Sequence, residues 1–225
     1  MLIFALDSSA TAASSALVED GKILSENYLN IGLKHSETLG ILVDNTLKTA
    51  GKKVEDIDLF AVTHGPGSFT GIRIGVSLIK GLAAANDTPC FGVSALEAIA
   101  YPLKDFDTLA VSVMDARCKQ VYNAIFENGN RLCDDRAIST DELAEELKQY
   151  NKKITLIGDG AEIVYNEIGS ENIVLANPQI RFQRASSAAL LAEYYIKNTA
   201  MTPKAAMYIN PVYLRKPQAE RMRGE

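Results

Sequence analysis

Short runs of apolar residues alternate along this chain with stretches in which apolar residues recur at helical spacing. The unbroken apolar run 2–6 is typical of a buried strand, and the Asp20-Gly21 pair predicts a tight hairpin turn between two further strands. Leu39 and Val43 share one face of a predicted helix. In the first half of the chain we expect strands at 2–6, 14–19, 22–29, 59–63 and 90–93, and helices at 36–50, 70–85 and 95–101.

The same order of elements then begins again. The apolar run 109–114 ends in Asp115, as the run 2–6 ends in Asp7. Ser139, with a glutamate three residues later, predicts the start of a helix by a capping box. In the second half we expect strands at 109–114, 120–126, 131–138 and 154–157, and helices from Ser139, at 161–168 and at 186–198. Three strands, a helix, a strand and a helix, given twice, predict two related α/β halves, which we place at 1–104 and 105–225.

The most informative segment is 64–75, which reads His-Gly-Pro-Gly-Ser-Phe-Thr-Gly-Ile-Arg-Ile-Gly and lies where a predicted strand passes into a helix. Glycines in this place permit positive φ and close approach of backbones, and Ser68 or Thr70 is suited to cap the helix. Amides at such a helix start are able to hold an anion, but the glycines would equally serve tight packing alone. The segment is neither a P-loop nor a dinucleotide-binding fingerprint.

Composition narrows the class of protein. The 225 residues, of which 47% are hydrophobic, supply a sizeable core for one or two domains. No apolar run reaches the roughly 18 residues of a membrane span, and no basic region precedes the first strand, so we expect a cytoplasmic protein. The net charge of −5 argues against a stand-alone nucleic-acid binder. Arg215, Lys216, Arg221 and Arg223 are expected to form a solvated basic tail.

Cysteines and histidines offer little catalytic chemistry. Cys90, Cys118 and Cys133 form neither a zinc pattern nor a disulfide framework, so we expect reduced and mostly buried thiols. His35 precedes a helix and His64 precedes the glycine-rich segment, and no Ser or Cys nucleophile can be placed beside either from the sequence. We expect both histidines to be structural or to contact a partner.

Taken together, the motifs resemble those of the TsaB (YeaZ) family, part of the bacterial machinery that places threonylcarbamoyl on adenosine 37 of tRNA. The resemblance covers nearly the whole chain, and 65–75 is its most specific stretch. Further motifs in the same order are Asp7-Ser8-Ser9, His35-Ser36, Gly92-Val93-Ser94-Ala95-Leu96-Glu97-Ala98, Asp115-Ala116-Arg117, Gly158-Asp159-Gly160 and Pro211-Val212-Tyr213-Leu214-Arg215.

The resemblance implies a fold and a candidate nucleotide cleft. It implies two ribonuclease-H-like α/β lobes of the actin, sugar-kinase and Hsp70 (ASKHA) superfamily, in which the first hairpin embraces a nucleotide phosphate. ATP or ADP would then bind in the assembled complex. The cleft would come with the fold, whereas its ability to bind nucleotide would be either retained or lost. Alternatively, the first aspartate only satisfies amides of its turn. The cleft residues that the resemblance implies are Asp7, Ser8, Ser9, Thr11, Asp115, Gly158, Asp159 and Gly160.

The resemblance also implies that the chain lacks a catalytic metal site. In the catalytic paralogue, TsaD, two histidines one helical turn apart bind the metal. Ala95 and Ile99 occupy the matching positions here, and neither has a donor atom. Glu97 remains and is expected to be a surface or capping carboxylate. We therefore expect no metal and no catalytic residue, and a non-catalytic scaffold subunit of the tRNA-modifying complex.

What remains is a surface for a partner. The family resemblance implies that the helices 35–51 and 70–85 pair with the equivalent helices of TsaD, and that a weak homodimer uses the same surface. A small ATPase, TsaE, is expected to regulate the assembly, tRNA to be contacted only indirectly, and no membrane to be involved. The expected interface residues are His35, Leu39, Val43, Gly71, Ile72, Arg73, Ile74, Gly75 and Leu78. The alternative is an independent enzyme, either an ATP-dependent kinase-like protein or a peptidase.

Overall fold

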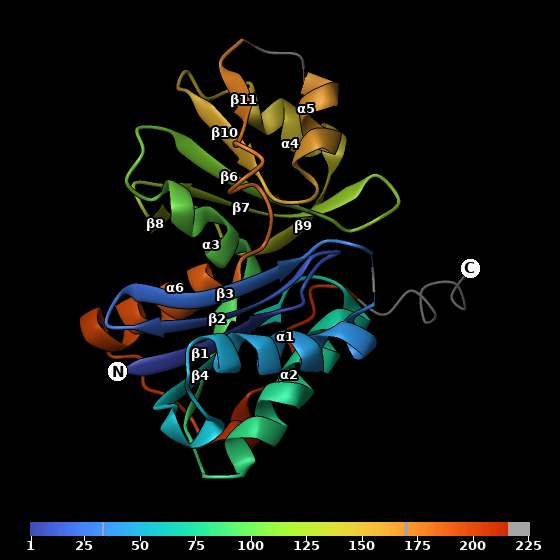
Figure 1. Ribbon diagram of the computed structural model, residues 1–225. Coiled ribbons are helices and arrows are strands. Elements are labelled where there is room, and N and C mark those ends of the chain that lie inside the picture. The colour runs from blue at the N-terminus through green and yellow to red at the C-terminus, as the bar shows by residue number, and fades with distance from the viewer. Residues whose placement is uncertain (33, 169–170, 216–225) are drawn as a thin grey trace.

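The computed structural model describes residues 1–32, 34–168 and 171–215, which build two mixed β-sheets with helices on their faces (Figure 1). The strands of the first sheet are β1 (Leu2–Asp7), β2 (Ala13–Glu19), β3 (Lys22–Leu29), β4 (Leu59–Gly65) and β5 (Cys90–Ser94). Those of the second are β6 (Leu109–Asp115), β7 (Gln120–Glu127), β8 (Asn130–Arg131), β9 (Arg136–Ser139), β10 (Ile154–Ile157) and β11 (Ile173–Leu175). The α-helices are α1 (His35–Thr49), α2 (Phe69–Ala84), α3 (Ala95–Ala100), α4 (Thr140–Leu147), α5 (Ala161–Ile168) and α6 (Ala185–Asn198). Short 3₁₀ helices span Val54–Asp56 (η1), Tyr101–Leu103 (η2) and Ala206–Tyr208 (η3).

The two sheets share one strand order, which confirms the predicted repeat. The first sheet runs β3-β2-β1-β4-β5, and the second runs β8-β7-β6-β10-β11, with β9 also paired to β7. In each sheet the first strand lies antiparallel to the second and parallel to the strand that follows the first outer helix. The expected ASKHA arrangement of two ribonuclease-H-like lobes is therefore present.

The helices and sheets are stacked in layers (Figure 1). Alternate residues of β1 point to opposite faces: Phe4 and Leu6 pack with α1 and α2, whereas Ile3 and Ala5 pack with α6. The second sheet divides in the same way, with one face on α4 and α5 and the other on α3. Helices α1 and α2 therefore form the outer layer of the first lobe, while α3 and α6 lie between the sheets.

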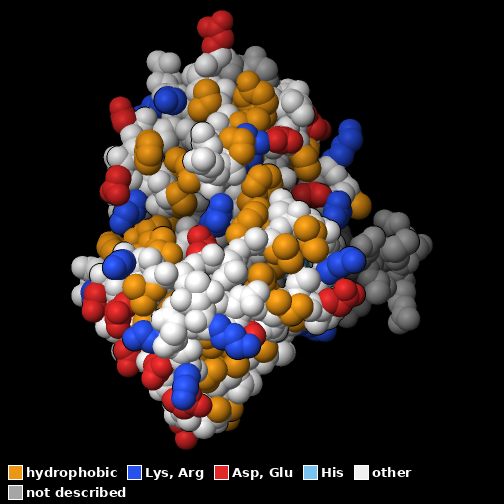
Figure 2. Space-filling view, viewed as in Figure 1, with side chains coloured by type: hydrophobic (Ala, Val, Ile, Leu, Met, Phe, Trp, Pro, Cys, Tyr) orange, Lys and Arg blue, Asp and Glu red, His pale blue; other side chains and the backbone are white. Residues whose placement is uncertain are grey.

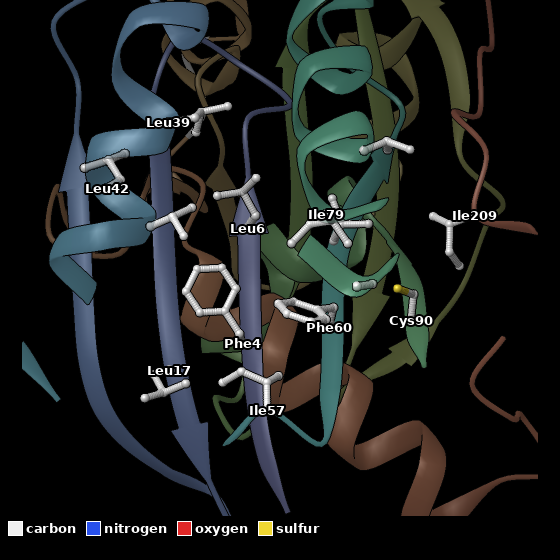
Figure 3. Close-up of a cluster of buried hydrophobic side chains, with 14 of the residues drawn as sticks. Phe4, Leu6, Leu17, Leu39, Leu42, Ile57, Phe60, Ile79, Cys90 and Ile209 are labelled. Atoms are coloured by element: carbon white, nitrogen blue, oxygen red, sulfur yellow. The ribbon is translucent and has the colours of Figure 1, made fainter. Parts of the chain in front are cut away.

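A dense core fixes α1 and α2 on the first sheet. Figure 3 shows Phe4, Leu6 and Phe60 of the sheet facing side chains of both helices, and the rings of Phe4 and Phe60 meet edge to face with centroids 5.9 Å apart. Leu39 is 1% exposed and Ile79 is fully buried. Because burial of each such side chain contributes about 1.5–3 kcal/mol, the inner faces of these two helices are committed to this core.

The predicted turns and one predicted strand have different outcomes. Asp20-Gly21 and Asn128-Gly129 both have positive φ at each residue, so hairpin turns form as expected. The single strand predicted over 131–138 is wrong, because it is divided into β8 and β9. Arg131 donates hydrogen bonds to the Cys133 carbonyl and the Asp135 carboxylate, which hold the chain in a turn between the two short strands. Strand β11 was not predicted.

After β11 the chain returns to the first lobe. Helix α6 packs on β1 and β2 through a face rich in alanine, and Lys204 pairs by backbone with Cys90 at the edge of β5. The expected boundary at residue 104 lies between the two sheets, whereas the expected second domain, 105–225, includes this helix. How the chain divides into units that fold separately stays a prediction.

None of the helices in the described ranges is long and apolar enough to cross a bilayer. Of the expected basic tail, Lys216, Arg221 and Arg223 lie outside the described residues. Arg215 is described, and its guanidinium donates a hydrogen bond to the Ala116 carbonyl at 2.8 Å. The three cysteines are free, but the expectation of mostly buried thiols is wrong: Cys90 is buried, Cys133 is half-buried, and Cys118 is exposed because it lies in the tip of the β6–β7 turn.

Candidate functional site

The glycine signature and the β1–β2 turn lie directly against each other. Ser68 caps α2, because its hydroxyl oxygen accepts a hydrogen bond from the Gly71 amide at 3.2 Å. The Ser68 amide donates to the Ser9 carbonyl at 2.7 Å, and the Ser8 hydroxyl donates to the Gly71 carbonyl at 2.9 Å. The start of α2 is thus hydrogen-bonded to the turn after β1.

The signature glycines are required by this contact. A Cβ added at Gly67 or Gly71 would lie well within 3.0 Å of the backbone carbonyl oxygen of Ser9 or Ser8, and one at Gly75 would collide with the Ser8 hydroxyl. Ser8 and Ser9 are fully buried as a result. Of the two interpretations of the glycines, tight packing has direct support, since the turn offers a phosphate no open approach from this side.

Asp7 ends β1 inside this turn and has no exposed surface. Its Oδ1 accepts hydrogen bonds from the Ser9 amide at 2.9 Å and from the Ser9 hydroxyl at 2.7 Å, whereas its Oδ2 has no partner within the described chain. Burial raises the pKa of Asp7, and the Ser9 hydrogen bonds oppose that rise. Asp7 therefore satisfies the amide of its own turn, as the alternative interpretation of this residue supposed.

Two further aspartates face Asp7 from the second lobe. Burial, with smaller contributions from the charges of Asp115 and Asp7, raises the pKa of Asp159 to about 6, although a hydrogen bond from Gln183 at 2.9 Å opposes the rise. Asp115 accepts a hydrogen bond from the Arg117 amide and pairs with the Arg117 guanidinium at 3.1 Å. The structure thus brings Asp159 within electrostatic range of both Asp7 and Asp115.

The remaining predicted cleft residues have packing roles or stand at the edge. Gly158 has φ +113°, and a Cβ there would collide with the Val113 carbonyl, while the Gly160 amide donates to that same carbonyl. Thr11 is half-buried in the β1–β2 turn. The cleft is therefore acidic and closely packed at the place where the resemblance implied a nucleotide phosphate.

Both histidines are bonded to the backbone rather than to a nucleophile. The His35 Nε2 donates to the Ala10 carbonyl at 2.7 Å, which ties the start of α1 to the β1–β2 turn. Burial lowers the pKa of His64, and a hydrogen bond with the Asn210 backbone opposes that shift. The interpretation of both residues as structural is consistent with these contacts.

The start of α3 does not fit a metal. Ala95 is fully buried and Ile99 is 2% exposed, and both pack in the core between the lobes. Across the described ranges, no three His, Cys, Asp or Glu side chains are placed to hold a metal ion. Glu97, expected at the surface or as a cap, instead accepts hydrogen bonds from Arg131 at 2.7 Å and from the Tyr195 hydroxyl. It joins α3, β8 and α6.

The expected interface residues separate into two groups. Six of them are buried in this chain because they face the first sheet or the β1–β2 turn: His35, Leu39, Val43, Gly71, Ile72 and Gly75. Arg73 is exposed, and Ile74 and Leu78 are half-buried. Of the nine expected residues, Arg73, Ile74 and Leu78 are therefore at least partly accessible, whereas the other six are not.

Sequence reasoning missed the residues that do form the outward face. Ile41 of α1 is 60% exposed, and Gly40 beside it and Gly81 of α2 are exposed too. A Cβ added at either glycine would meet nothing within 4 Å, so the chain's own packing requires neither. Figure 2 shows hydrophobic and charged side chains mixed over these two helices. Glycines inside amphipathic helices were the available signal.

The motif Pro211-Val212-Tyr213-Leu214-Arg215 was noted in the sequence, but its contacts with the start of α2 were not predicted. The Tyr213 ring lies on Phe69 with centroids 4.8 Å apart, and the Tyr213 hydroxyl accepts a hydrogen bond from Arg73 at 2.7 Å. The Arg73 guanidinium stacks over Phe69 at 3.7 Å. The Val212 amide donates to the His64 carbonyl, so the C-terminal motif holds the glycine signature in place.

Comparisons with known proteins place this geometry in a family. A family model described as "TsaD: tRNA N6-adenosine threonylcarbamoyltransferase" matches residues 30–222. The tRNA threonylcarbamoyladenosine biosynthesis protein TsaB of Escherichia coli is 30% identical over 96% of this chain and 95% of its own length. That of Bacillus subtilis is 32% identical over 70% of this chain and 71% of its own length. A tRNA N6-adenosine threonylcarbamoyltransferase of Kosmotoga olearia is 30% identical over 82% of this chain but only 60% of its own length.

Solved structures agree with these relatives. YeaZ from Pseudomonas aeruginosa superposes with a TM-score of 0.78 and 26% identity, over 95% of this chain and 99% of that one. At 14% identity, which supports the fold alone, component A of (R)-2-hydroxyglutaryl-CoA dehydratase from Acidaminococcus fermentans superposes with a TM-score of 0.54 over 88% of this chain and 98% of that one. The chain belongs to the TsaB (YeaZ) family of tRNA threonylcarbamoyladenosine biosynthesis proteins.

Proposed function

We propose that this chain is a non-catalytic scaffold subunit that binds the transferase TsaD and supports its transfer of threonylcarbamoyl to tRNA. The observation that carries the proposal is the outward face of α1 and α2. It holds an exposed isoleucine, Ile41, and two exposed glycines, Gly40 and Gly81, that the chain's own packing does not require. A helix pair with such gaps fits helices of a partner that approach closely.

Relatedness to the partner supports the mode of binding. The matching family model is that of the transferase, so the two proteins share a fold core over most of this chain. Paralogues that share a surface pair through equivalent elements in a pseudo-two-fold arrangement. The equivalents of α1 and α2 in TsaD are therefore the proposed counterpart, and a weak homodimer would use the same face.

The interior of the chain supports a role without chemistry of its own. Ala95 and Ile99 stand where the transferase family carries metal ligands, and both are core residues. His35 and His64 are engaged by backbone groups. ATP or ADP, the small ATPase TsaE and tRNA are proposed to act at the assembled complex rather than on this chain alone, which would work in the cytoplasm.

The complex with TsaD tests the proposal. Purified chain and TsaD from the same organism are mixed at micromolar concentration and analysed by chromatography with light scattering. We expect a one-to-one complex, and we expect Ile41→Glu to weaken it at least tenfold, because a charge would be buried in an apolar contact. Ile163→Glu, at another exposed isoleucine, on α5 in the other lobe, is the control and should leave the complex intact. Separate elution of the two wild-type proteins would refute the scaffold role.

The alternative, an independent ATP-dependent enzyme, makes a different prediction. Millimolar ATP with magnesium should raise the melting temperature of the isolated chain if its cleft binds nucleotide. We expect no shift, because Ser8 and Ser9 are buried against the signature and the cleft holds three carboxylates. A clear shift would favour the kinase-like alternative over the scaffold.

A further inference from the structure

A second hollow lies on the side of the molecule where α3 and α6 meet the β7–β8 hairpin. Its volume is about 210 Å³, and it is lined by residues of α3, the 3₁₀ helix η2, β6, β7, the β7–β8 turn and α6. In Figure 1 these elements meet at the left-hand junction of the two lobes, and Figure 2 shows hydrophobic side chains gathered there. The hollow is separate from the aspartate cleft and from the proposed partner face.

The floor of this hollow is apolar. Leu103, Ala110, Phe126 and Leu191 line it, and each is at most 4% exposed. Its volume is below the roughly 300 Å³ at which sites for drug-sized ligands begin, so the occupant is a small molecule. Such a floor favours a ligand with a compact aliphatic or aromatic group.

The rim carries one charge of each sign on the neighbouring residues Lys104 and Asp105. The Lys104 ammonium donates a hydrogen bond to the Tyr101 hydroxyl at 3.1 Å and stands 4.5 Å from the centre of that ring. An ammonium has three donors, so others are left for a ligand. The Asp105 carboxylate is exposed, and within the described ranges it accepts no hydrogen bond. Asn128 and Asn130 of the hairpin turn add amide groups to the same rim.

The third charge at this site is already satisfied. Both oxygens of Glu97 are occupied, one by Arg131 and the other by the Tyr195 hydroxyl. Glu97 therefore forms a fixed wall whose charge is already paired with that of Arg131. The groups left for recognition are the Lys104 ammonium and the Asp105 carboxylate, whose charges sum to zero.

We propose that this hollow binds a free α-amino acid with an apolar side chain. Lys104 binds the ligand carboxylate, Asp105 binds its ammonium, and the side chain rests on Leu103, Ala110 and Phe126. A carboxylic acid alone would face Asp105 with a like charge, and an amine alone would face Lys104. Like-charge contacts oppose binding of either, which is how a paired rim selects a zwitterion. The ligand would join α3 and α6 to the second sheet.

Isothermal titration calorimetry on the full-length chain tests the proposal with three matched probes. The probes are L-leucine, 4-methylpentanoic acid, which lacks the amine, and 3-methylbutylamine, which lacks the carboxylate. We expect leucine to bind with a Kd of about 1 mM or tighter and the two analogues to bind at least tenfold more weakly. No heat from leucine at about 10 mM, or equal binding of either analogue, would overturn the proposal.

Variants at the rim locate the site. Lys104→Ala and Asp105→Asn should each weaken leucine binding at least tenfold, because each removes one charge of the pair. Both residues are at the surface or half-buried, so the variants should fold. Lys148→Ala and Asp141→Asn on α4 are the matched controls and should bind leucine as the wild type does. Unchanged binding in both rim variants would show that leucine binds elsewhere and would overturn the assignment.

Discussion

Asp159 is held in an environment that opposes its own charge. It lies in the cleft with Asp7 and Asp115, and the charges of those two residues add to burial in raising its pKa to about 6. Kinases of this fold relieve such a concentration of carboxylates with a metal-bound nucleotide. Here Asp115 is paired with Arg117, and Asp159 receives one hydrogen bond from Gln183. The charge that remains on Asp159 therefore destabilises the folded state.

We therefore predict that Asp159→Asn stabilises the chain at neutral pH. The unfolded pKa is near 3.8 and the folded pKa is about 6, so the folded state binds more protons between these values. The free energy of unfolding of the wild type must then fall as pH rises through that window. An asparagine keeps an acceptor for Gln183 and carries no charge. The gain in the free energy of unfolding should be about 1–3 kcal/mol near pH 7, a range that allows for partial solvation of the side chain. The gain should vanish towards pH 4.

Urea denaturation of both proteins at a series of pH values measures this difference. Asp141→Asn, in the first turn of α4 and exposed, is the control and should show no such pH-dependent gain. If Asp159→Asn were equally or less stable than the wild type at neutral pH, the aspartate would have a stabilising role that its surroundings do not show.

At this scale the sequence offered candidate residues but not their state. The three aspartates were implied as cleft residues by the family resemblance, and the fold places Asp159 within electrostatic range of Asp7 and Asp115. That Ser8 and Ser9 would be sealed by Gly67 and Gly71 depends on how two distant turns meet. The order of residues along the chain does not show that these two turns lie against each other.

Helices α1 and α2 carry two glycines whose presence costs stability within the isolated chain. Gly40 and Gly81 lie inside helices, without positive φ, and a Cβ at either would enter open space. Glycine in a helix interior destabilises it by about 0.5–1 kcal/mol relative to alanine. The proposed partner face supplies a reason for keeping both.

We predict that Gly40→Ala with Gly81→Ala raises the free energy of unfolding of the isolated chain by about 1–2 kcal/mol while weakening the complex with TsaD. The gain comes from helix propensity, and the loss comes from two methyl groups that would hold the partner helices apart. Thermal or urea unfolding measures the first effect, and light scattering of the mixture measures the second. Unchanged complex formation in this stabilised variant would place the partner on another face.

Gly71→Ala is the contrasting variant on the same helix. Its Cβ would collide with the Ser8 carbonyl, so backbone must move, and we expect a loss of about 1–3 kcal/mol in the free energy of unfolding. If alanine lowers the free energy of unfolding at Gly71 but raises it at Gly40 and Gly81, the glycine required by packing is distinguished from those available to a partner.

Most elements followed from hydrophobic period and capping signals. The helix start at Ser139 was anticipated, and Ser68 was one of the two caps considered for α2, since a serine ahead of an apolar periodic stretch is a strong local signal. The region 131–138 was not, because its division rests on Arg131 reaching Asp135 and Glu97. Side-chain contacts of that kind override a weak strand pattern.

On the scale of the whole molecule, the two lobes are tied together by an exchange of helices. Helix α3 follows β5 but packs on β6 and β7, and α6 follows β11 but packs on β1 and β2. The repeat of elements was legible in the sequence, whereas this exchange was not, because an apolar helix face does not specify which sheet it will cover. Because alanine side chains are small, the alanine-rich face of α6 lies close to the first sheet.

The exchange predicts that residues 1–104 will not fold alone. One face of their sheet, which includes Ile3, Ala5 and Val18, is fully buried in the complete chain largely by α6. Without α6 that face meets water, and each large side chain loses about 1.5–3 kcal/mol of burial. A fragment that ends at residue 104 should show no cooperative urea transition.

Restoring the missing layer should restore the transition. In a second fragment, residues 185–215 are joined to 1–104 by a long flexible glycine–serine linker, which supplies α6 and the segment that pairs with Cys90. We expect cooperative unfolding in this fragment, but not when Ala188→Asp and Ala192→Asp charge the buried face of α6. Circular dichroism during urea titration distinguishes the fragment 1–104, the linked fragment and its doubly substituted variant. A cooperative transition in 1–104 by itself would mean that α6 is an accessory to the first lobe, and the lobes could then be separated at residue 104 after all.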